Sequence, residues 1–303
     1  MAAAAGAACI STSAVVMKLA GSSASMTALG RAGFALPVLG LLAWAERRRG
    51  AAPMTGRARW LARLAGAFLA ADLILWSHAI DDIGAGLSTV IDNLQVVLVP
   101  LTAWALLGER PHRRLIIALP VMLGGLMLVG GTGGYGTHPA LGTVLGVGVA
   151  ALYTVYILML RQATAPGVFT VNEERPPVAA PLFEATAGVA AGSLVLGLVL
   201  RDFRLGPAWP DLGWLLVLAM TSQVLGWLLI TMSMPRLPAW LVSVLLLVQP
   251  IGSLILGAVF LRERPSPPQI AGAVVMLAGI LIAATGQHRA PGPAAVPAAS
   301  GVT

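Results

Sequence analysis

Apolar stretches of about twenty residues follow one another along almost the whole chain, separated by short polar or arginine-bearing segments. A helix that crosses a lipid bilayer needs about 20 predominantly apolar residues. The pattern therefore predicts an all-α integral membrane protein with ten transmembrane helices. The predicted spans are residues 2–19, 26–45, 60–80, 84–107, 115–130, 140–160, 178–200, 212–234, 239–261 and 270–286.

Composition supports this interpretation. Hydrophobic residues make up 57% of the 303 residues and charged residues 10%, against roughly 45–50% and about 25% in soluble domains. So little charge does not cover the surface of a water-soluble fold. Residues 287–303 are rich in alanine and proline, which predicts a disordered tail.

Several functional classes lack their sequence signals. A single cysteine, Cys9, cannot form an internal disulfide, and the four histidines lie far apart. The chain contains no phosphate-binding loop motif and only one lysine. We therefore expect no cofactor, no metal and no enzymatic activity. The arginines lie in short clusters between spans, which favours a role in membrane topology over nucleic-acid binding.

Arginine placement also predicts the orientation of the chain. With a cytoplasmic N-terminus, thirteen arginines fall in inner loops and the C-terminal tail and four in outer loops. Because short cytoplasmic loops collect positive charge, we expect a multi-pass protein of the plasma (inner) membrane with both termini in the cytoplasm. Tryptophans at predicted span ends, Trp44, Trp60, Trp209 and Trp240, are expected to anchor at the interfaces.

An internal repeat relates the two halves of the chain. A shift of 154 residues aligns 84–130 with 238–284, matches Gln95 with Gln249, and matches Glu109-Arg110-Pro111 with Glu263-Arg264-Pro265. Each copy holds five spans, an odd number, so the second copy crosses the bilayer in the opposite sense. We predict two inverted five-helix repeats, residues 1–134 and 135–286, with Glu109 at the inner face and Glu263 at the outer.

These features resemble a known family. The segment VVMKLA at 15–20 followed by Arg31, the segment DLILWSHAIDDIGAG at 72–86, and the span ends WALLGERP and GAVFLRERP are similar to the ten-helix EamA-type members of the drug/metabolite transporter superfamily. The resemblance implies export of amino acids, other small metabolites or drugs by alternating access. Asp92 and Asn93 depart from the family, whose members more often have apolar or small residues there.

Four ionisable side chains fall within the spans. Lys18 and Arg31 are predicted near the outer ends of the first two spans, and Asp72 and Asp92 lie in the third and fourth. A charge inside the bilayer costs about 2.5–3.5 kcal/mol on insertion scales, so each group needs a partner or a wet cavity. Two alternatives follow: the groups form ion pairs that hold helices together, or they bind the ammonium and carboxylate of a zwitterionic solute.

Polar residues on the fourth and ninth spans extend this candidate site. Ser88, Asp92 and Gln95 have i, i+4, i+7 spacing, which places them on one face of a continuous helix, and Gln249 and Ser253 repeat part of the pattern. Such residues bind a polar solute or form hydrogen bonds between helices. Glu184, near the start of the seventh span, is predicted to lie at the inner interface in contact with water, where proton coupling is an alternative.

Aromatic residues accompany these polar groups. Asp72 with Trp76, and Gln223 with Trp227, are spaced i, i+4, which predicts a polar group beside an aromatic wall; core packing explains the same pattern. His78 is either a gate residue or a solvated histidine at a loop edge. The full set of candidate solute contacts is Lys18, Asp72, Trp76, His78, Ser88, Asp92, Asn93, Gln95, Tyr153, Tyr156, Gln223, Trp227 and Gln249.

Together, the residues and the resemblance predict a secondary transporter that exports amino acids, with a preference for aromatic or large apolar side chains, or related small metabolites. Efflux of cationic drugs such as quaternary ammonium compounds is the alternative. The expected partners are a small-molecule solute and the lipid bilayer, with no nucleic acid and no obligatory protein partner.

Overall fold

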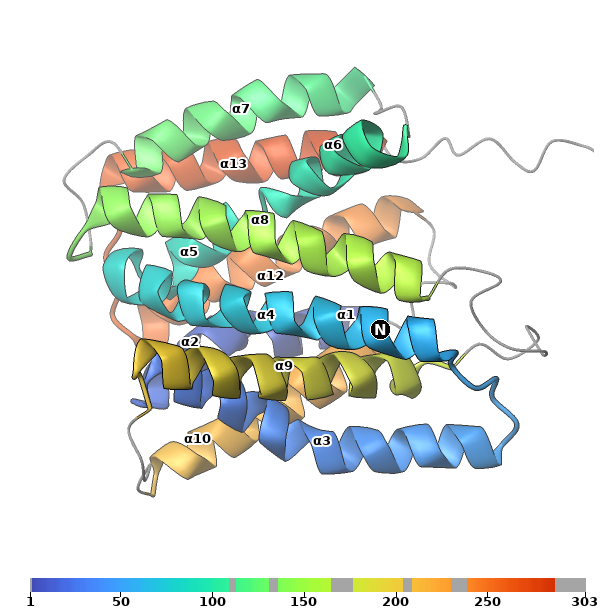
Figure 1. The fold of residues 1–303 in the computed structure, drawn as a ribbon. Coiled ribbons are helices and arrows are strands. Elements are labelled where there is room, and N and C mark those ends of the chain that lie inside the picture. Colours follow the sequence, from blue (N-terminus) through green and yellow to red (C-terminus); the bar gives the residue numbers. More distant parts are fainter. Residues whose placement is uncertain are drawn as a thin grey trace, which may run out of the picture.

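The computed structural model describes residues 2–108, 113–130, 136–164, 177–203, 209–229 and 239–286. Every regular element in these ranges is a helix, and the helices form one bundle in which consecutive spans run in opposite directions (Figure 1). The elements are α1 (Ala2–Ser11), α2 (Ser13–Leu19), α3 (Ala24–Arg48), α4 (Gly56–Ile83), α5 (Ala85–Asp92), α6 (Gln95–Leu107), α7 (Arg113–Gly130), α8 (Pro139–Ala163), α9 (Ala179–Leu200), α10 (Asp211–Leu218), the π-helix η1 (Ala219–Gly226), α12 (Ala239–Phe260) and α13 (Pro267–Gly286).

The predicted fold class is confirmed. Eight helical segments of the described chain are long and apolar enough to cross a membrane, and two shorter apolar stretches, Ala5–Leu19 and Leu247–Phe260, complete ten spans. Spans one, four and eight each consist of two elements: α1 with α2, α5 with α6, and α10 with η1. The predicted tail and the motif residues Glu109, Arg110 and Pro111 lie outside the described residues.

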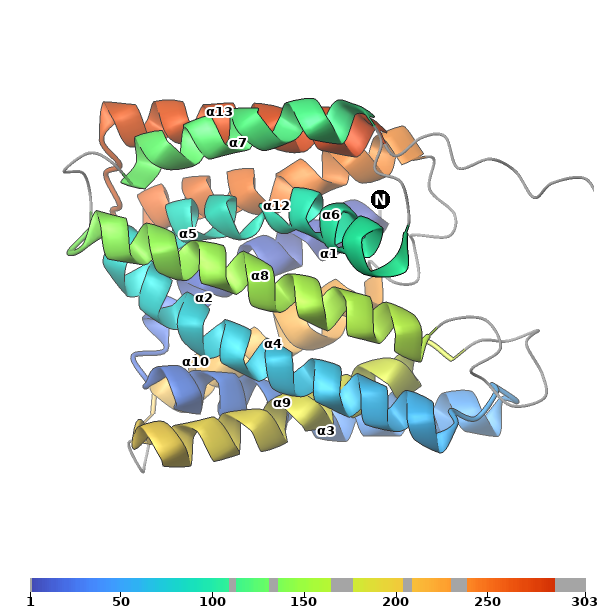
Figure 2. The same ribbon diagram turned by 45° about the horizontal axis from the view of Figure 1, so that its top comes forward.

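Helix pairing follows the two inverted repeats. Helix α3 packs against α9, α5 against α12 and α7 against α13, and each pair joins corresponding spans of the two halves. The third span of each half also packs against the first two spans of the other half. In the first half α4 packs against α8 and α9, and in the second half α10 and η1 pack against α1, α2 and α3. Figures 1 and 2 both show α7 beside α13 and α3 beside α9 on opposite sides of the bundle. A two-fold relation between halves produces this exchange of partners.

Hydroxyl side chains cap the N-termini of two of the long helices, α3 and α4. The Ser23 hydroxyl accepts a hydrogen bond from the backbone N–H of Met26 at 3.4 Å, and the Thr55 hydroxyl accepts one from Ala58 at 3.2 Å. Such caps satisfy backbone donors that have no partner inside the helix. They fix the starts of α3 and α4, the helices that carry Arg31 and Asp72.

The α4–α9 contact depends on two glycines. A Cβ atom built on Gly66 would overlap the backbone oxygen of Ala185, and one on Gly188 would overlap that of Arg63. The backbones of the two helices therefore approach more closely than any side chain allows, as small residues at membrane helix contacts permit. This contact holds α4, and with it Asp72, against the second repeat.

Span four is not the continuous helix that the sequence predicts. It breaks at Asn93 and Leu94, where the backbone N–H groups of Leu94, Val96 and Val97 donate to carbonyls three residues earlier. The Asn93 amide Nδ2 also donates to the Thr89 carbonyl at 2.8 Å. An asparagine side chain that competes for helix carbonyls explains why α5 ends here.

Span one is interrupted near the same level. Thr12 separates α1 from α2, and the Ser11 hydroxyl donates to the carbonyls of Ala7 at 2.8 Å and Val248 at 3.1 Å. The Ser253 hydroxyl donates back to the Ser11 carbonyl at 2.9 Å. Ser253 thus joins α12 to the interrupted first span, and the helix-bonding alternative holds for this residue.

Glu263, predicted at the outer face, lies between α12 and α13 and contacts the start of α5. Its side chain is buried and accepts hydrogen bonds from the backbone N–H groups of Ala85 at 2.6 Å and Gly86 at 3.2 Å. The carboxyl group therefore caps the N-terminus of α5, where unpaired N–H groups favour an acidic side chain. Gly84 precedes the cap with a φ of 87°, and a Cβ there would contact Glu263.

Glu184 is also more enclosed than predicted. Its side chain is 7% exposed, and its two carboxyl oxygens accept hydrogen bonds from Arg59 Nε at 2.7 Å and Arg63 Nε at 2.6 Å. Both arginines lie on α4, so the contact joins the start of α9 to that helix. This arrangement gives Glu184 a structural role.

The predicted interfacial tryptophans Trp44, Trp60 and Trp209 are 55%, 64% and 79% exposed, as membrane anchors are. Trp104, on α6, is 51% exposed on the outer surface of the bundle. The side chain of Trp240 lies outside the described residues.

Replacing Gly66 with alanine should destabilise the protein, because the new methyl group meets backbone rather than a flexible side chain. Overpacking of this kind costs about 1–3 kcal/mol. We expect a lower Tm for purified Gly66→Ala, while Gly33→Ala and Gly124→Ala, whose added Cβ atoms have no neighbour within 4 Å, should leave the Tm unchanged or raise it. A Gly66→Ala variant as stable as these controls would contradict the close α4–α9 contact.

Removing the Glu263 carboxyl should leave two buried backbone donors without an acceptor. Each such loss costs about 1–3 kcal/mol, so Glu263→Ala should lower the Tm of the purified protein, and Glu263→Gln, which keeps one acceptor oxygen, should lower it less. The neighbouring Arg264 is exposed, and Arg264→Ala serves as the control. Equal Tm values for the two alanine variants would show that Glu263 does not cap α5.

Candidate functional site

A cavity of about 300 Å³ lies where the interrupted spans meet. Seven of the ten spans contribute to its lining, from both repeats. The lining residues are Ile10, Ser13, Arg31, Leu69, Asp72, Leu73, Trp76, Asp92, Asn93, Gln95, Val96, Val99, Pro100, Tyr153, Ile157, Trp227 and Gln249.

Two carboxyl groups face this cavity with unused hydrogen-bonding capacity. Asp72 on α4 and Asp92 at the end of α5 are 3% and 6% exposed. The Oδ1 atom of each is buried and has no hydrogen-bond partner in the described part of the chain, and neither has Nε1 of Trp76. Buried polar atoms are rarely left unpaired. A donor brought by a ligand or by water would satisfy these acceptors.

Arg31 supplies the opposite chemistry. It is 5% exposed, and its Nε donates to Gln223 Oε1 at 2.8 Å while Nη1 donates to the Ser13 hydroxyl at 3.3 Å. Gln223 in turn donates through Nε2 to the Thr186 hydroxyl at 3.0 Å. These partners fix the guanidinium yet use only two of its five N–H donors.

Arg31, predicted toward the outer end of the second span, lies in the first half of α3 and is buried beside the cavity. Within the described residues neither Arg31 nor Lys18 has an ion pair with Asp72 or Asp92, which contradicts the alternative that these intramembrane charges pair with one another. Lys18 Nζ is 3.5 Å from the Ile80 carbonyl oxygen instead.

An aromatic cluster forms another wall. Tyr153 packs edge-on against Tyr156 with ring centroids 5.3 Å apart, and Tyr156 packs edge-on against Trp227 at 6.4 Å. Tyr153 and Trp227 line the cavity, and Tyr156 lies behind them, 1% exposed. With Trp76, these rings place apolar surface beside the carboxyl and guanidinium groups.

The structure brings together eight of the thirteen predicted solute contacts and leaves five away from the cavity wall. The eight are Asp72, Trp76, Asp92, Asn93, Gln95, Tyr153, Trp227 and Gln249. Gln223 and Tyr156 support lining residues from behind. The break after Asp92 separates Ser88 from the helix face on which Gln95 lies. The Ser88 hydroxyl donates to the Ala85 carbonyl at 3.2 Å. His78 is exposed.

Arg31 lines the cavity although the list of thirteen predicted contacts omits it. Its signal was readable and placed it among the intramembrane charges, because an arginine within an apolar span requires a partner or a polar cavity. Ser13 and Ile10 carried none, since their place on the wall depends on the interruption at Thr12. In the part of the chain that the structure describes, no three histidine, cysteine or acidic side chains gather as a metal site would require.

Comparisons with known proteins agree with this architecture. A family model described as the EamA-like transporter family matches residues 1–131 and 140–285. Curated proteins give no match. Among solved structures 17 chains match, and one, described only as the crystal structure of a protein, is 18% identical with a TM-score of 0.61 over 93% of this chain and 94% of its own. At that identity the likeness shows the fold alone.

The family match covers nearly all of both halves of the chain and agrees with the apolar helices of the structure. The chain belongs to the EamA-like transporter family and is a multi-pass membrane protein.

Proposed function

We propose that this protein is a secondary transporter that moves amino acids, or closely related small metabolites, outward across the inner membrane by alternating access. The observation that carries the proposal is the central cavity, in which unpartnered carboxyl oxygens and a fixed guanidinium lie among aromatic rings. Membership of a transporter family favours transport over catalysis.

The cavity offers complementary groups for both ends of a zwitterion. An ammonium group has three donors and no acceptor, and it would donate to the free oxygens of Asp72 and Asp92. A carboxylate would accept from the unused N–H groups of Arg31, the side chain best suited to carboxylates. Gln95 and Gln249, related by the internal repeat, can each donate or accept and adapt to either end.

The aromatic wall favours solutes with an aromatic or large apolar side chain. Trp76, Tyr153 and Trp227 surround the apolar part of the cavity. Binding sites for drug-sized ligands span about 300–1,000 Å³, so a cavity of about 300 Å³ is at the small end of that range. A single amino acid fits this size better than a bulky drug.

The interrupted spans support an alternating-access mechanism. Broken helices around a central site, in two inverted repeats, are a recurring design of secondary transporters. The cavity lining includes residues of α6 between Gln95 and Pro100 and the α8 residues Tyr153 and Ile157. From these residues both helices continue toward the end of the bundle that holds their C-termini. At the opposite end the Glu263 cap holds α5 against the second repeat. Orientation with both termini in the cytoplasm rests on the arginine distribution.

Efflux of cationic drugs is the second candidate. The two carboxyl groups outnumber the single arginine in the cavity lining, and a desolvated cation beside aromatic rings gains cation–π attraction. Competition separates the two candidates. Neutral zwitterionic amino acids should inhibit uptake of a labelled amino acid into proteoliposomes, whereas a drug exporter would be inhibited by quaternary ammonium compounds.

The variant Asp92→Asn should lower the initial rate of amino-acid transport in proteoliposomes about tenfold or more, because one charge-assisted hydrogen bond to the ammonium is lost. Asp81→Asn, an exposed position at the end of the same α4 helix that carries Asp72, should transport at the original rate. Both variants should reach the membrane at normal yield. Normal flux through Asp92→Asn would contradict a solute contact at this residue.

A further inference from the structure

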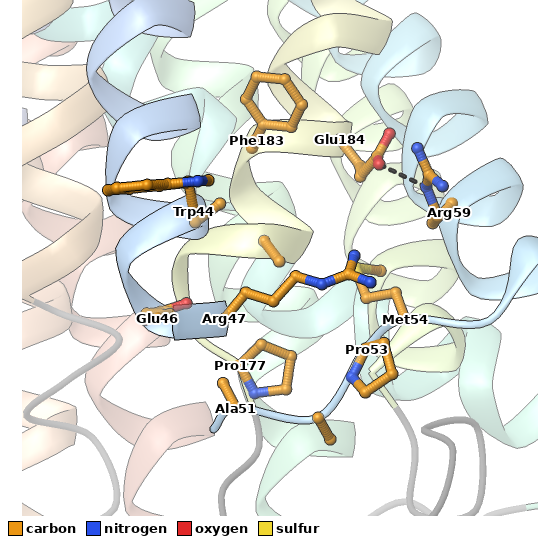
Figure 3. A pocket seen from close by; sticks show the side chains of 13 residues that line it. Trp44, Glu46, Arg47, Ala51, Pro53, Met54, Arg59, Pro177, Phe183 and Glu184 are labelled. Atoms are coloured by element: carbon orange, nitrogen blue, oxygen red, sulfur yellow. Dashed lines mark hydrogen bonds and ion pairs between the residues drawn. The ribbon is translucent and has the colours of Figure 1, made fainter. Parts of the chain in front are cut away.

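A second cavity, of about 230 Å³, lies at one end of the bundle, where α3 ends and α4 and α9 begin. Figure 3 shows the Arg47 side chain extending from the end of α3 across this cavity toward Pro53 and Met54. Arg59 and Glu184 lie deeper, joined by their ion pair (Figure 3). This cavity shares no lining residue with the central one.

Both acidic side chains of the cavity have hydrogen-bond partners within the described residues. Glu46 accepts hydrogen bonds from the backbone N–H groups of Val178 at 3.2 Å and Ala179 at 2.8 Å, so its charge lies against the start of α9. Glu184 accepts from Arg59 and Arg63. Glu184 is therefore paired with two arginines, and one oxygen of Glu46, Oε2, is bound by backbone donors at the start of α9.

The basic side chains keep unused donors. Among the described residues, the Arg47 side chain has no hydrogen bond or ion pair, and the Arg59 side chain uses only its Nε. As far as the described residues show, the guanidinium of Arg47 and the two terminal nitrogens of Arg59 remain available in the lining of one cavity. Arginine forks of this kind bind phosphate oxygens through paired charge-assisted hydrogen bonds.

The surroundings place this cavity at the membrane interface. Trp44 lines it and is 55% exposed, and the Arg48 guanidinium lies 4.7 Å from the centre of the Trp44 ring. Trp and Arg occur together at the level of lipid headgroups. From Trp44 an apolar stripe continues along α3 through the exposed residues Leu41, Pro37 and Phe34, with the spacing of one helix face. Acyl chains would lie along this stripe.

We propose that this cavity binds the phosphate group of an anionic phospholipid, with Arg47 as the main contact and Arg59 as the second. Basic pockets between membrane helices are suited to such headgroups. The apolar stripe that begins at Trp44 favours a lipid over free phosphate, because a soluble anion gains nothing from exposed Leu41 and Phe34. The inference is independent of the transported solute.

The test measures the Tm of the purified full-length protein in detergent during titration with phosphatidylglycerol. Phosphatidylcholine tests whether the effect requires negative charge, and glycerol phosphate and inorganic phosphate test whether it requires acyl chains. The variants are Arg47→Gln, Arg47→Lys and, as a matched control, Arg57→Gln, an exposed arginine at the same end of the bundle that does not line the cavity.

Phosphatidylglycerol should raise the Tm of the original protein and of Arg57→Gln at the same concentrations. Arg47→Gln should need about tenfold more lipid for the same shift, the effect of one lost charge-assisted hydrogen bond, and Arg47→Lys should fall between them. Equal sensitivity of Arg47→Gln and Arg57→Gln, or equal stabilisation by phosphatidylcholine, would overturn the proposal. Equal stabilisation by glycerol phosphate or inorganic phosphate would overturn its assignment to a lipid.

Discussion

The rest of the structure depends on one constraint, which is that lipid offers no hydrogen bonds. Backbone breaks and polar side chains within a membrane persist only where protein or water satisfies them. Within the described ranges, three spans depart from regular α-helix, at Thr12, at Asn93 and over Ala219–Gly226. All three lie beside or within the network around the central cavity, through Ser13, Asn93 and Gln223. The irregular backbone and the polar cavity therefore explain each other.

The rigid parts of the bundle hold this irregular centre in place. Gly66 and Gly188 bring α4 and α9 into backbone contact, and Glu184 joins the same helices through Arg59 and Arg63. At the other end of the bundle Glu263 caps α5, whose last residue is Asp92. Glu184 thus holds two helices together and Glu263 caps a third. The residues proposed to contact solute are those whose hydrogen bonding is incomplete. The duplicated Glu-Arg-Pro motif has a structural role in the copy that the structure describes.

Fold class and much of the central cavity could be predicted from the sequence, because membrane spans and intramembrane charges follow from composition and position alone. Span length gave the ten helices, and the polar residues Asp72, Asp92, Gln95 and Gln249 were identified as unsuited to lipid. What could not be predicted follows from the helix interruptions. Periodicity assumes a continuous helix, so it grouped Ser88 with Gln95. It also gave no reason to place Arg31 against Gln223, 192 residues away.

The central claim is that water and solute reach a chamber inside the bundle, and cysteine accessibility measures this directly. In a Cys9→Ser background, Val99→Cys places a thiol on the cavity wall, and Val274→Cys places one on the outer face of α13, at a residue that is 59% exposed. In membranes, a water-soluble thiol reagent should modify Val99→Cys, a transported amino acid should slow that reaction, and Val274→Cys should stay unmodified in lipid. If Val99→Cys reacts no faster than Val274→Cys, the chamber does not admit water and the account is contradicted.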